Sequence, residues 1–263
     1  MPEKLVIKGL VLRETQTREA DKIMTVLTAE RGRLGVIARG ARRKNSRIAA
    51  ASELLAYSEL VLYERRGWYL LDEASTLALW DKVRRDVVLL SLASYFAEMA
   101  EAVTAEDVPA PETMSLLLNA LYALDATNKP PELVKAAYEL KLLALAGYEP
   151  LVADCAVCGK PAPEEPLFDA EQGVVLCRAC AGAAARSMLP LDAGSLAAMR
   201  HVLGAEKKRM LSFSLHGETM RRFSRVCEVF ARRQLDRSFR TLDFYKSLSL
   251  PGEYAKSDNN QQY

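Results

Sequence analysis

The stretch TAERGRLGVIARG, residues Thr28–Gly40, predicts a β-hairpin with a tight turn at Gly32 and a second strand directly after it. Short runs of the same kind, apolar and rich in β-branched residues, flank it: KLVIKGLVL and KIMTVLT before it, and a longer pair after it. Residues 4–76 therefore predict five or so short strands. That many strands in so short a segment indicate a small closed or half-closed β-barrel rather than a sandwich.

The longer pair, ELLAYSELVLYERRGWYLLDEA at residues 53–74, predicts another hairpin that turns at Arg65-Arg66-Gly67. Along its first strand, Tyr57–Tyr63, the odd-numbered residues are expected to share one face, with Leu60 and Leu62 on the other.

The pattern changes from strand to helix near Asp81. DKVRRDVVLLSLASYFAEMAEAV has a helical period, a short apolar helix follows, and a third segment opens with prolines and ends at Gly147. A cysteine-rich insert comes next, and the helical pattern then resumes to about Leu250. The sequence predicts an α+β multidomain chain divided into a barrel at 1–80, a helical domain at 81–150 and 186–250, a four-cysteine module at 151–185, and a disordered polar tail at 251–263.

Two CxxC pairs, CAVC at 155–158 and CRAC at 177–180, stand eighteen residues apart. Each CxxC turn can direct two thiolates at one point, and two such turns complete a tetrahedron around zinc. The predicted ligands are Cys155, Cys158, Cys177 and Cys180. Four thiolates leave the metal no open position, so we expect one structural Zn²⁺. Disulfides are the alternative, but the lysines and glutamate near the start differ from a secretory signal and favour a reducing, cytoplasmic location.

Positive charge is concentrated in one segment. The chain carries 36 Lys and Arg against 34 Asp and Glu, a net charge of +2. Residues 31–47 hold seven cations and no acid; without them the remaining 29 bases face 34 acids, a net charge of −5. Such a local positive field suits a surface that binds phosphates, although a run of charge is also typical of a solvated loop. The seven cations are Arg31, Arg33, Arg39, Arg42, Arg43, Lys44 and Arg47.

A second, more diffuse excess of positive charge lies toward the C-terminus. In ETMRRFSRVCEVFARRQL, helical spacing predicts an apolar stripe that includes Cys227, which we interpret as a small buried side chain. The arginines fall on a different arc, which is either solvated or a surface for DNA or an acidic partner. They are Arg221, Arg222, Arg225, Arg232 and Arg233.

The motifs of common enzyme classes are missing from the sequence. It contains no GxxxxGK[ST], no GxGxxG after a strand and no GxSxG. His216-Gly217-Glu218 matches the HxE element of zinc deaminases, but it follows both CxxC pairs instead of preceding one. We therefore predict that the chain is not an enzyme and that His201 and His216 are ordinary surface or interface residues.

A small barrel with a cationic loop suits single-stranded nucleic acid, because cations follow the phosphates and aromatic rings stack on unpaired bases. The candidate rings are Tyr57, Tyr63, Trp68 and Tyr69, about half of which we expect in the core. Gly32, Gly35 and Gly40 are expected to let the backbone approach the ligand.

Four N-terminal segments resemble the RecO family of bacterial recombination mediators. They are Gly9–Arg13, Glu19–Ile23, Thr28–Gly32 and Ala38–Arg47, matching G-x-V-L-R, E-x-D-K-[IL], T-x-x-x-G and A-[KR]-G-A-R-[RK]-x-x-[SN]-R. The CxxC pairs and the C-terminal RRQLDRSFRTLDFYKSL are similar to zinc-bearing members of that family.

The resemblance implies an oligonucleotide-binding (OB) fold for the barrel and a role in DNA repair in the bacterial cytoplasm, at the nucleoid. It further implies binding of single- and double-stranded DNA, annealing of complementary strands, and action with RecR to load RecA onto DNA coated by single-strand binding protein. No membrane association is expected.

Two other functions remain open at this point. Barrels and zinc ribbons also serve RNA, so an RNA-binding or ribosome-associated protein is the main alternative. A metalloenzyme that uses the cysteine cluster is the other.

Overall fold

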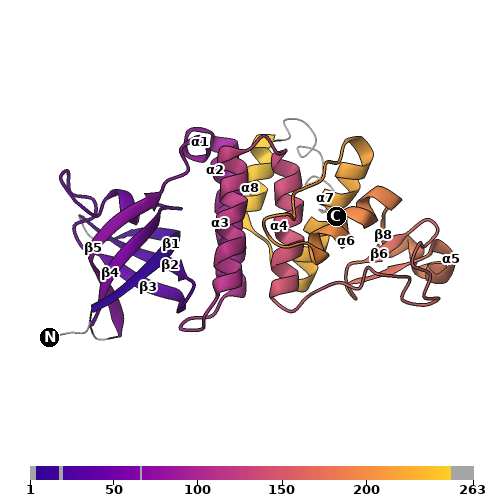
Figure 1. Cartoon of the computed structure of the whole chain (residues 1–263), viewed down its shortest axis with the longest axis horizontal. Helices are drawn as coiled ribbons and strands as arrows, with labels where there is room; N and C mark the ends of the chain where they lie inside the picture. Colours follow the sequence, from indigo (N-terminus) through magenta and orange to yellow (C-terminus); the bar gives the residue numbers. More distant parts are fainter. Residues whose placement is uncertain (1–3, 18–19, 66, 250–263) are drawn as a thin grey trace, which may run out of the picture. The chain divides into compact units, whose positions relative to one another are not determined.

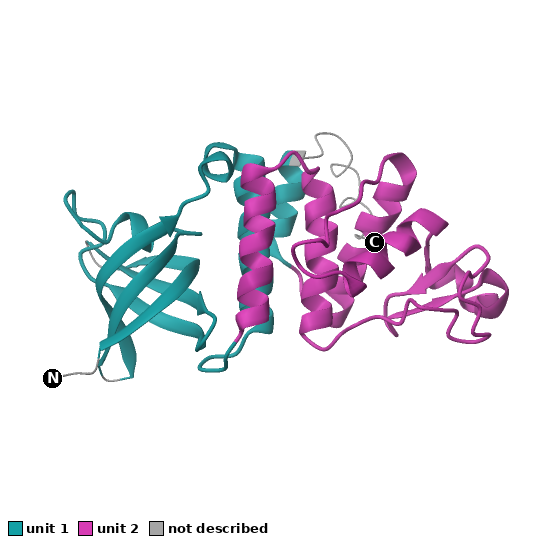
Figure 2. Cartoon of the chain, viewed as in Figure 1, with its two compact units in different colours: residues 1–109, 239–263 teal, residues 110–238 magenta. Residues whose placement is uncertain are grey.

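The computed structural model describes residues 4–17, 20–65 and 67–249. The chain divides into two compact units, residues 1–109 with 239–263 and residues 110–238 (Figure 2). These units differ from the predicted division into a barrel, a helical domain and a cysteine module, which stays a prediction. The tail at 251–263 and Arg66 of the predicted turn lie outside the described residues.

The first unit contains a closed barrel (Figure 1). Its strands within the described residues are β1 (Lys4–Thr17), β2 (Asp21–Thr28), β3 (Gly32–Ala38), β4 (Tyr57–Arg65) and β5 (Trp68–Ala78). They close in the order β1-β2-β3-β5-β4, and only β3 and β5 pair in parallel, through Val36↔Tyr69 and Ile37↔Leu70. This is an OB-like barrel and confirms the predicted fold class.

Alternation along the strands fills the barrel. On β4 the even-numbered residues Ser58, Leu60 and Leu62 are buried while the odd-numbered ones are half-buried or exposed, as predicted. Met24 and Val36 contribute to the same core from β2 and β3. Side chains therefore occupy the barrel interior, and any ligand must bind its outer face.

Within the described residues, three helices and one 3₁₀ turn, η1 (Ala50–Ser52), complete the first unit. The helices are α1 (Asp81–Arg85), α2 (Val87–Val103) and α8 (Arg240–Ser249). Asp86 caps α2 by accepting hydrogen bonds from the backbone N–H groups of Val88 and Leu89, at 2.8 and 3.2 Å. Just before α8, Phe239 packs edge-on against Tyr95 of α2, with ring centroids 5.3 Å apart.

The second unit is a helical bundle with the cysteine module attached. Its helices are α3 (Pro111–Ala126), α4 (Pro131–Leu145), α6 (Ala193–Gly204) and α7 (Gly217–Gln234). The module contains β6 (Leu167–Asp169), β7 (Val174–Leu176), β8 (Leu189–Pro190), α5 (Arg178–Ala181) and η2 (Gly182–Ser187). As predicted, α4 begins with proline and Gly147 follows its end with φ +93°. No helix among the described residues is long and apolar enough to span a membrane.

A buried ion triad joins α4 to α7. Lys135 Nζ lies 2.9 Å from Glu139 Oε1 and 2.9 Å from Glu228 Oε2, and the Lys135 and Glu139 side chains are only 3% and 0% exposed. Burial lowers the pKa of Lys135, but the two carboxylates outweigh it and raise that pKa above its usual value. Cys227 lies beside Glu228 in the sequence and is fully buried, as predicted.

Replacing Lys135 by methionine leaves Glu139 buried without its cation, since methionine keeps the length of the side chain but not the charge. We expect Lys135→Met to lower the free energy of unfolding by about 3–5 kcal/mol in urea titrations. Lys160→Met, on a surface pair with Glu164 at 3.6 Å, serves as the control and is expected to change it by less than about 1 kcal/mol. Equal losses in the two variants would contradict the assignment.

Candidate nucleic-acid interface and cysteine cluster

Residues 39–47, called the basic loop below, follow the end of β3. Two buried residues, one within the loop and one directly after it, hold it to the barrel. Ala41 and Ile48 belong to the barrel core. Asp21 Oδ1 accepts a hydrogen bond from the backbone N–H of Gly40 at 2.8 Å, and the Arg43 N–H donates to the Gly40 carbonyl at 3.1 Å. The segment is therefore a series of turns that is packed and hydrogen-bonded against the barrel.

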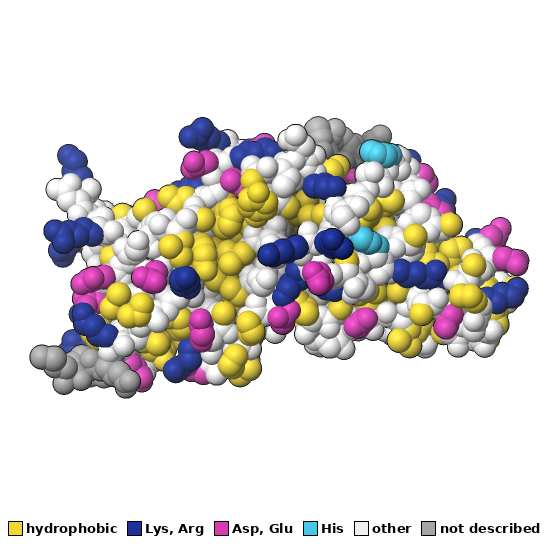
Figure 3. Space-filling model, in the orientation of Figure 1, with side chains coloured by type: hydrophobic (Ala, Val, Ile, Leu, Met, Phe, Trp, Pro, Cys, Tyr) yellow, Lys and Arg dark blue, Asp and Glu magenta, His cyan; other side chains and the backbone are white. Residues whose placement is uncertain are grey.

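The side chains of Arg39, Arg42, Arg43, Lys44 and Arg47 are exposed. Except for Arg42, these cations form no ion pair with any carboxylate in the described part of the chain. Figure 3 shows Lys and Arg side chains projecting at the left edge of the barrel in that view. Four unpaired cations on one short loop keep their full charge for an external anion.

Arg31 is the last residue of the turn before β3 and Arg33 is the second residue of that strand, and both differ from the basic loop. Arg31 Nη2 lies 3.0 Å from Asp107 Oδ1 and donates a hydrogen bond to Tyr69 Oη at 2.9 Å. Arg33 is half-buried, and its Nε is buried with no hydrogen-bond partner among the described residues. The structure thus separates the seven predicted cations into an exposed loop and a partly engaged hairpin, and their binding role stays a prediction.

Trp68 is the most exposed of the predicted stacking rings. Its six-membered ring lies against Gly35, where an added Cβ would be 3.5 Å from Cζ3, and 46% of the residue remains exposed. Arg33, Gly35 and Ile37 alternate with buried residues, so Gly35 belongs to the outer face of β3. The arrangement leaves nearly half of Trp68 accessible beside strand β3. Tyr57 and Tyr63 are half-buried on β4.

The expectation that the glycines admit the ligand is wrong for Gly32. A Cβ on Gly32 would lie 2.2 Å from the carbonyl oxygen of Val108, so the chain itself occupies that space. A Cβ on exposed Gly35 would make only an ordinary van der Waals contact with Trp68, at 3.5 Å, and the expectation for Gly35 stays a prediction.

The arginines of α7 separate into two groups. Arg221 and Arg222 both pair with Glu218, at 2.7 and 3.2 Å. Arg232 and Arg233 lie about 16 Å further along the helix axis, at 1.5 Å per residue. That Arg232, Arg233 or exposed Arg225 forms a surface for DNA or an acidic partner stays a prediction.

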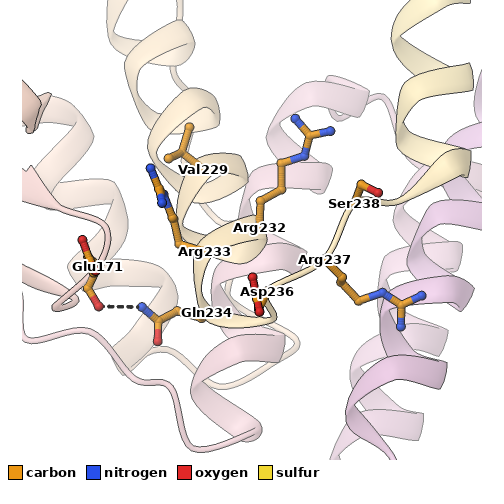
Figure 4. A pocket seen from close by; sticks show the side chains of 8 residues that line it. All are labelled: Glu171, Val229, Arg232, Arg233, Gln234, Asp236, Arg237 and Ser238. Atoms are coloured by element: carbon orange, nitrogen blue, oxygen red, sulfur yellow. Dashed lines mark hydrogen bonds between the residues drawn. The ribbon is translucent and has the colours of Figure 1, made fainter.

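A cavity of about 760 Å³ lies at the C-terminal end of α7. Its lining includes Arg232, Arg233 and Arg237, together with Asp236 and Glu171. In Figure 4 the three guanidinium groups point in different directions, and the amide of Gln234 is hydrogen-bonded to the Glu171 backbone. The three guanidinium groups therefore do not converge on one position at which a single anion could contact all of them.

The four predicted cysteines come together in the module. Their Sγ atoms all lie within 4.8 Å of one another, and the Sγ atoms of Cys158 and Cys177 are 3.7 Å apart. Four sulfurs at 2.3 Å from a tetrahedral metal would be about 3.8 Å apart. Donor set and spacing fit a tetrahedral thiolate site, so the chain has a four-cysteine cluster that could bind a metal ion.

Local backbone geometry forms the two knuckles. Gly159 has φ +69° and donates its N–H to the Cys155 carbonyl at 2.8 Å, which closes the first CxxC turn. Burial raises the pKa of the Cys155 thiol, but hydrogen bonds from the backbone of Cys158 and Cys177 outweigh it and lower that pKa to about 6. One thiolate is therefore available near neutral pH, whereas hydrogen bonding with Cys158 and burial raise the pKa of Cys180 to about 12.

The module is fastened to the helical bundle. Arg200 of α6 donates from Nε to the Val152 carbonyl at 2.7 Å, and Gln234 of α7 donates to the Ala170 carbonyl at 3.0 Å. Phe168 of β6 packs edge-on against Phe230, with ring centroids 5.3 Å apart. A metal that orders the cysteine loops therefore also supports one side of the bundle.

The sequence matches two family models that together cover most of its length. Residues 1–80 match "Recombination protein O N terminal" and residues 84–243 match "Recombination protein O C terminal". The chain belongs to the RecO family. The resemblance stated above is confirmed, and so is the prediction that the chain is not an enzyme, since this is a family of non-enzymatic recombination mediators.

Similar proteins cover nearly the whole chain. One is the "DNA repair protein RecO" of Acetivibrio thermocellus, 28% identical over 93% of this chain and 97% of the relative. The protein of that name from Symbiobacterium thermophilum is 29% identical over 92% and 96%. That of Anaeromyxobacter dehalogenans is 38% identical over 75% of this chain and 78% of the relative.

The two histidines lie outside the cysteine cluster. His216 occupies the N-cap position of α7 but its side chain makes no capping hydrogen bond, and the His201 ring packs on Phe213 with centroids 5.1 Å apart. Sequence reasoning missed Asp107, the partner of Arg31. An isolated aspartate 76 residues away from its arginine carries no local signal.

Cobalt(II) provides a test of the cysteine cluster, because tetrahedral thiolate coordination gives it intense visible absorption. We expect the apo chain to bind one equivalent, and Cys155→Ser and Cys180→Ser to abolish the spectrum. The matched control is Cys227→Ala, at the remaining cysteine, which lies outside the cluster and should leave the spectrum unchanged. Retention of the spectrum in Cys155→Ser would overturn the ligand set.

Proposed function

We propose that this chain is a DNA repair mediator that binds single- and double-stranded DNA on its barrel and anneals complementary strands. The observation that carries the proposal is the basic loop, whose exposed cations Arg39, Arg43, Lys44 and Arg47 lack described ion-pair partners. Arg42 of the loop and Arg31 and Arg33 of the hairpin extend the same cationic surface. Because strands repel each other through their phosphates, a surface that binds both lowers the barrier to pairing.

Trp68 adds selectivity for unpaired strands. Its open ring face offers a stacking surface, and a base can reach it only when it is not paired. Duplex DNA would use the cations alone. Tyr57 and Tyr63 are weaker candidates because both are half-buried.

Membership of the RecO family supports proposals for the partners and the metal. Acting with RecR, the chain would help load RecA onto DNA coated by single-strand binding protein in the bacterial cytoplasm. One Zn²⁺ held by the four cysteines would brace the second unit and take no part in chemistry, since four thiolates leave it no open position.

Charge reversal in the basic loop tests the proposal. We expect Arg43→Glu/Lys44→Glu to weaken binding of single strands at low salt and to flatten the plot of log K against log salt by about 1.4, since each lost contact removes about 0.7. Fluorescence-monitored annealing, with and without single-strand binding protein, should slow in parallel. Lys8→Glu/Arg85→Glu makes the same charge change at exposed positions outside the loop.

Wild-type binding and annealing in the loop variant would refute the proposal. Matched RNA oligonucleotides as competitors address the alternative function: if RNA displaced DNA at equal or lower concentration, an RNA-binding role would be favoured.

Trp68→Ala should weaken single-strand binding by about 1–3 kcal/mol, the usual contribution of one stacked base, and leave duplex binding unchanged. Trp68→Phe keeps an aromatic face and should retain most of the affinity. Fluorescence anisotropy with both substrates measures the difference. An equal loss for duplex and single strand would show that Trp68 acts through the fold and not by stacking.

A further inference from the structure

Arg31 is already occupied by an anion from its own chain. Asp107 Oδ1 accepts hydrogen bonds from Arg31 Nε at 3.1 Å and from Nη2 at 3.0 Å, and Nη2 also donates to Tyr69 Oη at 2.9 Å. A guanidinium fork binds a phosphate with the same two N–H groups. The carboxylate therefore takes the place that a DNA phosphate would take on this residue.

Asp107 is brought there by a close approach of the segment after α2 to the barrel. The backbone N–H of Arg33 donates to the Ala105 carbonyl at 3.1 Å, and Gly32 lacks the Cβ that would collide with the carbonyl oxygens of Ala105 and Val108 at 2.6 and 2.2 Å. Asp107 itself has φ +54°, a left-handed conformation that aspartate and asparagine tolerate better than most residues. Local geometry thus holds a carboxylate against the hairpin arginine.

We propose that Asp107 is an intramolecular competitor for phosphate at Arg31, which DNA displaces when it binds the basic surface. The inference rests on the proposed function. The two side chains are 44% and 60% exposed, so the pair exchanges with a ligand in water without a large desolvation cost. Asp107 therefore sets the affinity of the surface and does not block it.

Competition of this kind distinguishes ligands by the number of phosphates that they carry. A single phosphate that replaced Asp107 would exchange one ion pair with Arg31 for another and would gain little binding free energy. A strand that also contacts the basic loop keeps its phosphates near Arg31 at high effective concentration, so the exchange becomes favourable. The device selects polyanionic strands over isolated anions.

The test compares two neighbouring substitutions that remove the same charge. Asp107→Asn keeps the size and the left-handed backbone but weakens the contact with Arg31. Glu106→Gln changes an exposed carboxylate one residue away, whose side chain forms no ion pair within the described part of the chain. We expect Asp107→Asn to bind a single-stranded oligonucleotide two- to fivefold more tightly than Glu106→Gln in anisotropy titrations at low salt, the range of one exposed ion pair. Thermal unfolding establishes that both variants are folded.

Repeating the comparison in an Arg31→Gln background shows whether the effect passes through Arg31. We expect the difference between the two variants to vanish there. If Asp107→Asn bound no more tightly than Glu106→Gln, or if its gain persisted without Arg31, the proposal would be overturned and the pair would be a structural brace. Failure of this proposal can be distinguished from failure of the proposed function. If only the competition by Asp107 were wrong, Arg43→Glu/Lys44→Glu would still reduce the affinity for DNA.

Discussion

The parallel pairing of β3 with β5 is the contact on which the proposed binding surface depends. Among the described residues it consists of Val36↔Tyr69 and Ile37↔Leu70, and these two pairs close the barrel. Closure brings the start of β5 alongside β3, which lays Trp68 on Gly35 and brings the Tyr69 hydroxyl to Arg31. An open sheet would leave the aromatic rings and the cations on separate edges. The short closing ladder therefore assembles the surface as well as the core.

The distribution of charge supports the proposal that a nearly neutral chain attracts a polyanion. Arg39, Arg43, Lys44 and Arg47 of the basic loop form no ion pair with a carboxylate of the described chain, whereas acids elsewhere are often paired, as Glu218 is with Arg221 and Arg222. A local field that is not compensated within about one Debye length acts on a nearby strand regardless of net charge. Within the cationic segment Arg31 pairs with Asp107, and the competition proposed above would make part of that field adjustable.

Much of this architecture could be predicted because its signals are local. Alternation on β4, the prolines that begin α4 and the spacing of the two CxxC pairs each fix geometry over a few residues, and each was predicted correctly. Contacts that join distant segments could not be predicted. Arg31 and Asp107 lie 76 residues apart, and nothing near Gly35 indicates that an indole ring from the next hairpin covers it. The pairs on α7 are different, because Glu218 engages Arg221 and Arg222 at the local spacings i,i+3 and i,i+4, and the prediction considered only the arc that the arginines share.

The cysteine cluster shows why a metal suits the second unit of this chain. The module has three short strands, and its small buried core includes two of the cysteines themselves, so apolar burial alone offers it little stability. Its hydrogen bonds from Arg200 and Gln234 are accepted by the backbone carbonyls of Val152 and Ala170. Both carbonyls lie in loops and keep their positions only while those loops are ordered. Metal coordination would help to fix the Val152 carbonyl, three residues before Cys155, and would hold β7, which leads into Cys177 and pairs with β6 next to Ala170. Loss of the metal would then reach α6 and α7 through released hydrogen bonds, so the cluster would govern the stability of the helical bundle without touching a ligand.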